Sequence, residues 1–135
     1  MMNSYVANLI PNKRRPRVTH RGGFAKIYTP AETVLEEKVI ASVYKGELYT
    51  CPVRLIVHTY KALPKSRPKR IERERDTSTP DIDNIIKAIM DALNGVAYKD
   101  DRQVVEVHAI KHDKTRKAGD SIRFSVEPIA DGDYL

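Results

Sequence analysis

Alternating apolar and polar residues predict strands in several parts of the chain. From Pro52 to Tyr60, one set of alternate residues is mostly apolar and the other is mixed, which is typical of a strand with one face in the core. Similar patterns predict strands over Tyr5–Ile10, Val104–Ile110 and Ser121–Pro128. The segment Val18–Tyr28, with Gly22-Gly23 at its middle, predicts a hairpin.

A first helix is predicted from the sequence Thr29-Pro30-Ala31-Glu32. Thr29 is the expected N-cap, Pro30 takes the first helical position, and Glu32 completes a capping box. The helix should continue to about Lys45 and end at Gly46. The apolar residues of this helix are loosely spaced: Val34, Leu35, Ile40, Val43 and Tyr44. Part of the helix is therefore expected to face another subunit or solvent.

A second helix is marked by apolar residues at helical spacing, which predict one buried stripe: Ile82, Ile85, Ile86, Ile89 and Leu93. Gly95 supplies the C-terminal stop. The side away from the stripe is polar and carries Asp83, Lys87, Asp91 and Asn94.

The predicted order of strand, helix, strand, helix, strand and strand indicates a mixed α/β domain, that is, an α+β mixed sheet with two main helices. A length of 135 residues fits a single domain over residues 1–135, with a loose tail at 129–135. Residues Ala62–Ser78 lack any period and predict an exposed, mobile loop. A polar hairpin loop containing Lys114, Arg116, Lys117 and Gly119 is expected to join the last two strands.

Composition adds a preference for an anionic partner. The chain has 24 Lys and Arg against 18 Asp and Glu, a formal net charge of +6, which favours a phosphate backbone, although a merely soluble basic protein has the same balance. Cys51 is the single cysteine, which excludes an internal disulfide or a multi-cysteine zinc site, and it is expected to be a strand residue. Without a signal-type or membrane-spanning apolar run, we expect a cytoplasmic protein with no membrane partner.

The basic residues concentrate in two segments. Lys13, Arg14, Arg15, Arg17, Arg21 and Lys26 form the first, and Lys61, Lys65, Arg67, Lys69, Arg70, Arg73 and Arg75 form the second. Together they are more than half of the 24 basic residues. Such clusters suit contacts with the sugar-phosphate backbone of DNA, for which we single out Lys13, Arg14, Arg15, Arg17, Arg67, Lys69 and Arg70. A solvated surface is the alternative.

An acidic cluster interrupts this basic chain. Asp81 and Asp83 stand at the start of the second helix, and Asp100 and Asp101 precede the next strand. Carboxylate oxygens are the ligands of Mg²⁺, which keeps several waters and therefore needs only two or three of them. The alternative for Asp81 and Asp83 is capping of the helix, because acids there favour its dipole.

Lys87 follows Asp83 by one helical turn and can offset negative charge on a phosphate. Its alternative role is an ion pair with Asp83 or Asp91, which would contribute only about 0.2 to 0.5 kcal/mol. The four histidines show no metal-ligand spacing, and no Ser/His/Asp set or Gly-rich phosphate loop is present. The acidic cluster is thus the credible catalytic feature.

These residues resemble the RusA-type Holliday junction resolvases, which are small homodimeric endonucleases common in phages and prophages. The resemblance lies in Pro80-Asp81-Ile82-Asp83-Asn84-Ile85-Ile86-Lys87, Asp91-Ala92-Leu93-Asn94-Gly95 and Lys99-Asp100-Asp101-Arg102-Gln103-Val104. It extends to Pro11, Lys13, Arg15, Arg17, Tyr28-Thr29-Pro30 and Glu36. Thr79 departs from the pattern, since many relatives carry a basic residue there.

The resemblance implies catalytic metal ligands at Asp81, Asp83 and Asp101 and a functional lysine at Lys87. It also implies a homodimer that cleaves four-way DNA junctions by paired symmetric nicks in recombination and repair, with Mg²⁺ as cofactor and Mn²⁺ as a substitute. Two alternatives stay open. One is a noncatalytic protein that binds structured nucleic acid, and the other is a metal-dependent nuclease for flaps or other branched DNA.

Overall fold

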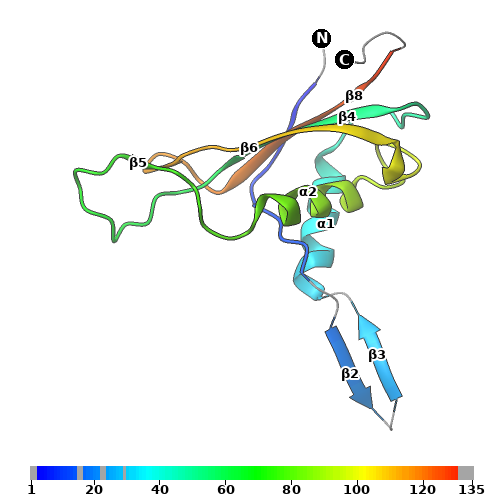
Figure 1. The fold of residues 1–135 in the computed structure, drawn as a ribbon, viewed down its shortest axis with the longest axis horizontal. Coiled ribbons are helices and arrows are strands. Elements are labelled where there is room, and N and C mark those ends of the chain that lie inside the picture. Colours follow the sequence, from blue (N-terminus) through cyan, green and yellow to red (C-terminus); the bar gives the residue numbers. More distant parts are fainter. Residues whose placement is uncertain (1–2, 15–16, 22–23, 29, 131–135) are drawn as a thin grey trace.

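The computed structural model describes residues 3–14, 17–21, 24–28 and 30–130. Its centre is a four-stranded sheet in the order β1-β8-β4-β6, comprising β1 (Tyr5–Ala7), β8 (Ser121–Pro128), β4 (Val53–Tyr60) and β6 (Val104–Lys111). Two helices, α1 (Ala31–Val43) and α2 (Ile82–Ala92), lie on one face of this sheet (Figure 1). The α+β fold with a mixed sheet and two main helices is therefore confirmed.

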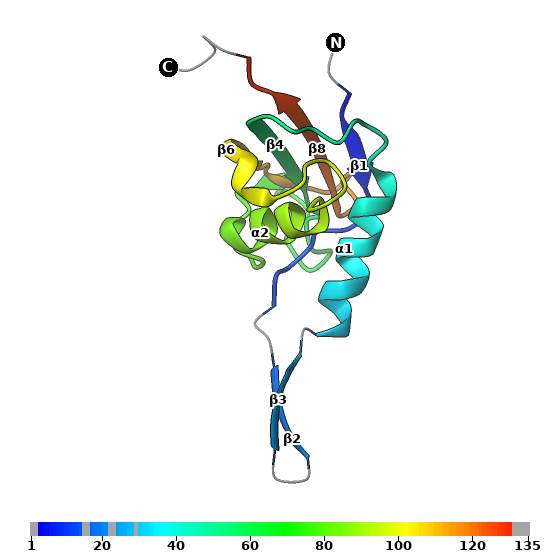
Figure 2. The same ribbon diagram turned by 90° about the vertical axis from the view of Figure 1, so that its right-hand side faces the viewer.

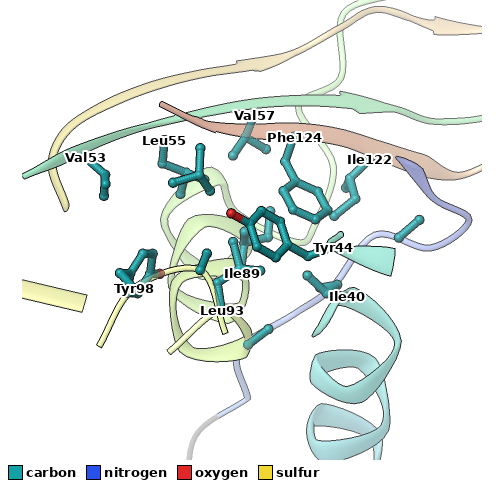
Figure 3. Close-up of a cluster of buried hydrophobic side chains, with 14 of the residues drawn as sticks. Ile40, Tyr44, Val53, Leu55, Val57, Ile89, Leu93, Tyr98, Ile122 and Phe124 are labelled. Carbon is teal, nitrogen blue, oxygen red and sulfur yellow. The ribbon is translucent and has the colours of Figure 1, made fainter. Parts of the chain in front are cut away.

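The alternation in β4 has the predicted consequence. Val53, Leu55, Val57 and Thr59 are buried, while the residues between them are only half-buried. The side chains of Val53, Leu55 and Val57 lie on the helix side of the sheet, in one cluster with Ile40, Tyr44, Ile89 and Phe124 (Figure 3). Each fully buried large apolar side chain contributes about 1.5 to 3 kcal/mol, so this layer accounts for the sandwich of sheet and helices.

The stripe on α2 is confirmed except at its first residue. Ile85, Ile89 and Leu93 are buried and Ile86 is half-buried, but Ile82 is 40% exposed because it precedes the part of the helix that lies under the sheet. The small side chains of Ala88 and Ala92 are also buried. Gly95 has a φ of 77°, which is the left-handed conformation expected after a helix end.

The predicted ends of α1 were wrong in two respects. Pro30 is the N-cap instead of the first helical residue, with its carbonyl accepting a bond from Val34 N at 3.3 Å, and no side chain of the described residues caps the helix. Thr29 lies outside the described residues. The helix ends at Val43, two residues before the predicted end, because Tyr44 turns to an extended conformation and buries its ring in the core. Leu35 remains 62% exposed, as the loose apolar spacing predicted.

The last two predicted strands, β6 and β8, are not neighbours in the four-stranded sheet. β4 lies between them, pairing parallel with β6 and antiparallel with β8. Two adjacent strands joined by a polar loop suggest a hairpin, but only the tertiary pairing shows that a third strand separates them. Cys51 was expected to be a strand residue, but it lies in the bend before β4.

Two smaller elements project from this body. The predicted hairpin is confirmed as β2 (Arg17–Arg21) paired with β3 (Phe24–Tyr28), and it extends away from α1 (Figures 1 and 2). Gly22-Gly23 lie outside the described residues. Residues 62–78 and 112–120 form a second projection, which we call the arm. It contains a short sheet that the sequence did not predict, made of β5 (Arg73–Glu74) and β7 (Lys114–Thr115).

The arm is held by bonds to polar side chains. Arg116 donates to the carbonyl oxygens of Pro68 at 2.7 Å and Ile71 at 3.1 Å, and Asp113 forms an ion pair with Arg73 at 3.0 Å. Glu74 pairs with Arg67 and with Lys114, and the bond to Arg67 is the main reason that the pKa of this carboxyl is lowered. The predicted loop thus has defined internal contacts.

At the C-terminal end, Ile129 is buried and its N–H donates to the carbonyl of Pro52 at 3.0 Å. This predicted start of the tail therefore packs on the body, and residues 131–135 lie outside the described part. Neither helix of the described chain has the length and apolar character needed to span a membrane.

Candidate metal and DNA site

Asp81 occupies the N-cap of α2 with an extended backbone, φ −66° and ψ 151°. Its backbone carbonyl accepts the first helical bond from Ile85 N at 3.1 Å. Its side chain, however, accepts no bond from the first turn. The bond that defines a capping carboxylate is therefore missing, and the carboxyl group of Asp81 is available to another partner.

Asp83 lies in the first turn of α2 and lines a pocket of about 300 Å³. The other lining residues are Ile86, Lys87, Met90, Asp91 and Asp101. Positions three and four residues apart share one side of a helix, so α2 alone brings together all of these side chains except Asp101. The pocket therefore combines one polar helix face with a residue from a distant turn.

Asp101 begins the short 3-10 helix η1 (Asp101–Gln103). Its neighbour Asp100 is the N-cap, and its carboxylate accepts a bond from Arg102 N at 2.9 Å while Gln103 Oε1 accepts one from Asp100 N at 3.0 Å. Of the two adjacent acids, Asp100 therefore serves the turn and Asp101 lines the pocket. Asp100 and Gln103 thus form a capping box that the sequence analysis did not predict.

The turn is fastened to α2 and to the body, which explains why Asp101 reaches Asp83. Tyr98 is fully buried and its hydroxyl donates to the carbonyl of Met90 at 2.6 Å. Gln103 Nε2 donates to the carbonyls of Tyr49 at 2.9 Å and Cys51 at 3.0 Å. Burial raises the pKa of Tyr98, and the charges of Asp101 and Asp91 raise it further, so this donor stays protonated.

Asp81, Asp83 and Asp101 differ in their bonding from several other acids of this chain, which has a net charge of +6. In the described part of the chain, none of their carboxylates forms a hydrogen bond or an ion pair, whereas Asp91, Asp113, Glu106 and Glu127 are all paired with basic side chains. Asp81 and Asp83 are exposed and Asp101 is half-buried, so these carboxylates are solvated by water and accessible to a ligand.

The donor set fits a hard divalent cation. Asp83 and Asp101 offer carboxylate oxygens in one open pocket, and Mg²⁺ is bound through few protein oxygens because it retains its waters. Asp81 lies two residues from Asp83 but does not line that pocket. Among the described residues, no three Asp, Glu, His or Cys side chains lie together closely enough to hold a metal ion. Of the three predicted ligands, Asp83 and Asp101 share one pocket and Asp81 lies outside it.

Lys87 lines the same pocket and its side chain is 64% exposed. Its Nζ lies 3.9 Å from Asp91 Oδ2, which corresponds to a weak helical pair. Asp91 has a closer partner in Lys13, whose Nζ is 3.1 Å away. The ammonium of Lys87 is therefore largely available to a ligand in the pocket.

The predicted DNA-binding residues fall into two groups. Lys13 forms bonds with Glu37 and Asp91, and Arg14 forms an ion pair with Glu36 at 2.6 Å. These two side chains tie the N-terminal segment to the helices. Arg15 and the side chain of Arg17 lie outside the described part.

The arm presents the remaining predicted residues. Arg67 is paired with Glu74, although its side chain stays 43% exposed. Lys69 and Arg70 are exposed, and within the described residues they form no hydrogen bond or ion pair. Among the predicted DNA-binding residues whose side chains are described, the two without a protein partner, Lys69 and Arg70, are both on the arm.

The comparison with protein families identifies the class of this chain. The model of the family described as "Endodeoxyribonuclease RusA" matches residues 9–123. The chain therefore belongs to the RusA endodeoxyribonuclease family, whose members are nucleases of the Holliday junction resolvase type, generally dependent on a metal. It is also 36% identical over 109 residues to the uncharacterized protein YqaN of Bacillus subtilis strain 168, covering 72% of this chain and 77% of that protein.

Sequence reasoning missed several residues of the site. Tyr98 and Gln103 were assigned no role, yet they hold the turn that presents Asp101. Asp91 was treated only as a helical partner of Lys87, but it lines the pocket. Its position two turns after Asp83 was a usable signal. For Tyr98 and Gln103 the sequence holds none, because their partners are backbone carbonyls of distant segments.

Proposed function

We propose that this chain is a Mg²⁺-dependent, structure-selective endodeoxyribonuclease that resolves four-way DNA junctions by paired nicks. One observation supports the proposal: Asp83 and Asp101 line one pocket, Asp81 lies at the start of the same helix, and their carboxylates have no partner among the described residues. Family membership supplies the class of reaction. Mn²⁺ is expected to replace Mg²⁺, because both accept oxygen ligands.

The roles of the residues follow from their positions. Asp81, Asp83 and Asp101 hold the cation, which when bound lowers the pKa of a coordinated water and stabilises charge on the phosphate. Lys87, which lines the same pocket, offsets the negative charge that grows on the phosphate oxygens. Lys69 and Arg70 on the arm contact the sugar-phosphate backbone of the duplex arms.

We further propose a homodimer, because one chain carries one acidic site and paired nicks need two. A two-fold dimer presents two identical sites to a junction that is itself roughly two-fold symmetric. The exposed apolar side chains on α1 support contact with a second subunit. Leu35 and Val39 lie one helical turn apart and are 62% and 41% exposed.

The test is cleavage of a synthetic four-way junction, compared with a flap, a Y-structure and a linear duplex of the same sequence. We expect two symmetric nicks in the junction, only with Mg²⁺ or Mn²⁺. Faster cleavage of flaps than of junctions would favour the nuclease for other branched DNA. Tight junction binding without any metal-dependent nicking would favour the noncatalytic binder and refute the proposal.

A further inference from the structure

The three residues before Asp81 are held through their backbone carbonyls by two lysines. Lys111 Nζ donates to the carbonyl of Ser78 at 2.6 Å and to that of Pro80 at 3.0 Å. Lys61 Nζ donates to the carbonyl of Thr79 at 2.7 Å and to the hydroxyl of Ser78 at 3.0 Å. Three successive carbonyl oxygens thus accept bonds from ammonium groups immediately before a proposed metal ligand.

The two lysines come from neighbouring strands. Lys111 is the last residue of β6, and Lys61 directly follows β4. Because β4 and β6 are parallel, with Thr59 paired to Lys111, both side chains start at the same end of the sheet. The sheet itself therefore supplies a rigid base for the segment of residues 78–80.

These lysines have no acidic partner among the described residues. Both are half-buried, and an ammonium group of this kind is normally matched with a carboxylate. Their donors are instead directed at the backbone. Those bonds use two of the three N–H donors of each ammonium group, so most of the donor capacity of both lysines is directed at residues 78–80.

The backbone of residues 78–80 decides where the Asp81 carboxylate points. Asp81 has an extended, non-helical conformation, so α2 does not set its direction, and no bond within the described residues holds its side chain. In contrast, Asp83 is fixed by the helix and Asp101 by the capped turn of η1. Asp81 needs a separate means of support.

We propose that Lys61 and Lys111 are positioning residues that aim Asp81 at the metal and thereby set the metal affinity of the site. The inference rests on the proposed function and assigns these lysines no contact with DNA or with the reacting atoms. Groups that orient a ligand from outside the coordination sphere typically change metal affinity by about 10- to 100-fold.

The experiment is a titration with Mn²⁺, followed by the electron paramagnetic resonance signal of the free ion, on the DNA-free protein. The variants are Lys61→Met and Lys111→Met, with Lys45→Met as control, because Lys45 is exposed and forms no hydrogen bond or ion pair within the described chain. We expect each of the first two to raise the dissociation constant for Mn²⁺ about tenfold or more. The control should match the unmodified protein.

A second readout separates positioning from a merely structural role. Junction cleavage by Lys61→Met and Lys111→Met should recover toward the normal rate at high Mg²⁺, because the ligand itself is intact. A folded variant with lower thermal stability but an unchanged dissociation constant would overturn the proposal. If a Met variant does not fold, Lys61→Gln and Lys111→Gln, which retain an amide donor, are judged by the same criterion.

Failure of the inference can be told from failure of the proposed function by including Asp81→Asn. If this variant loses Mn²⁺ binding but the lysine variants do not, the result supports the metal site and refutes the positioning role of the lysines. If Asp81→Asn binds Mn²⁺ as tightly as the unmodified protein, Asp81 is not a ligand, and the proposed function loses one of its three carboxylates.

Discussion

Lys13 Nζ lies 3.1 Å from Asp91 Oδ2 and 2.9 Å from Glu37 Oε1, so that one ammonium group joins the N-terminal segment to both helices. Burial alone would lower the pKa of Lys13, but the bonds to Glu37 and Asp91 outweigh it and raise the pKa above its usual range. A residue that resembled a DNA contact in the sequence is therefore a link between α1 and α2 at the edge of the acidic pocket.

Replacing Lys13 should test this link. Because its side chain is only 20% exposed and bridges two acids, Lys13→Met should lower the free energy of unfolding by about 1.5 to 3 kcal/mol, the range for hydrogen bonds to charged groups. Urea denaturation measures the loss. Lys38→Met, on α1 without a bond or ion pair in the described chain, is the matched control. Equal stability of the two variants would refute the link.

The proposed metal ligands should be separable from DNA binding. Asp81→Asn, Asp83→Asn and Asp101→Asn should each reduce junction cleavage by about 100-fold or more, since electrostatic groups at such sites contribute on that order. Junction affinity, measured by gel shift without metal, should be retained or increased because a negative charge is removed. Glu47→Gln is the control, because Glu47 is exposed and its carboxylate accepts no bond within the described residues. Normal cleavage by any of the three variants would remove that residue from the ligand set.

Salt dependence should distinguish the arm from the N-terminal cations. Each lost phosphate contact lowers the slope of log affinity against log salt by about 0.9 for duplex DNA. We expect Lys69→Gln combined with Arg70→Gln to lower the slope by about twice this amount, because neither side chain has a partner among the described residues. Arg14→Gln should leave it unchanged, because Arg14 is paired with Glu36. The reverse pattern would place the DNA at the N-terminal cluster.

The histidine pair predicts a loss of stability in mild acid. His58 Nδ1 and His112 Nε2 are 2.8 Å apart, which requires at least one unprotonated nitrogen. Burial lowers the pKa of His58, and the charges of His112 and Arg123 lower it further. A base with a lowered folded pKa contributes stability above its unfolded pKa, near 6.5, and this contribution is lost as pH falls below that value. As the pH is lowered from 7.5 to 5, the melting temperature of His58→Gln should therefore fall less than that of the unmodified protein.

Assembly is open to a direct measurement. Light scattering at micromolar concentration should report about twice the chain mass of 15.4 kDa. Leu35→Glu should shift the protein toward the monomer, because it places a charge on the exposed apolar side of α1. A monomer that still makes paired nicks in one junction would contradict the dimer, and a monomer that nicks once per substrate would support the flap nuclease.

The sequence by itself determined the elements that depend on local pattern. Period-two alternation was enough for β4, and the apolar stripe with its terminal glycine was enough for α2, because burial of one face decides both kinds of element. Asp81, Asp83 and Lys87 could be placed on one helix start for the same reason. The ends of α1 were less accessible, since the burial of Tyr44 overrides the stop signal at Gly46.

Only the tertiary structure decided which polar side chains are already used. Lys13 and Arg14 read as free cations until their partners on α1 and α2 are known. Asp100 and Asp101 are equivalent neighbours until the turn of η1 takes one of them as its cap. Lys61 and Lys111 join the site through backbone carbonyls, which every residue possesses and no sequence pattern marks. Hydrogen bonds between distant segments depend on how the sheet and helices pack, and the local sequence pattern does not predict that packing.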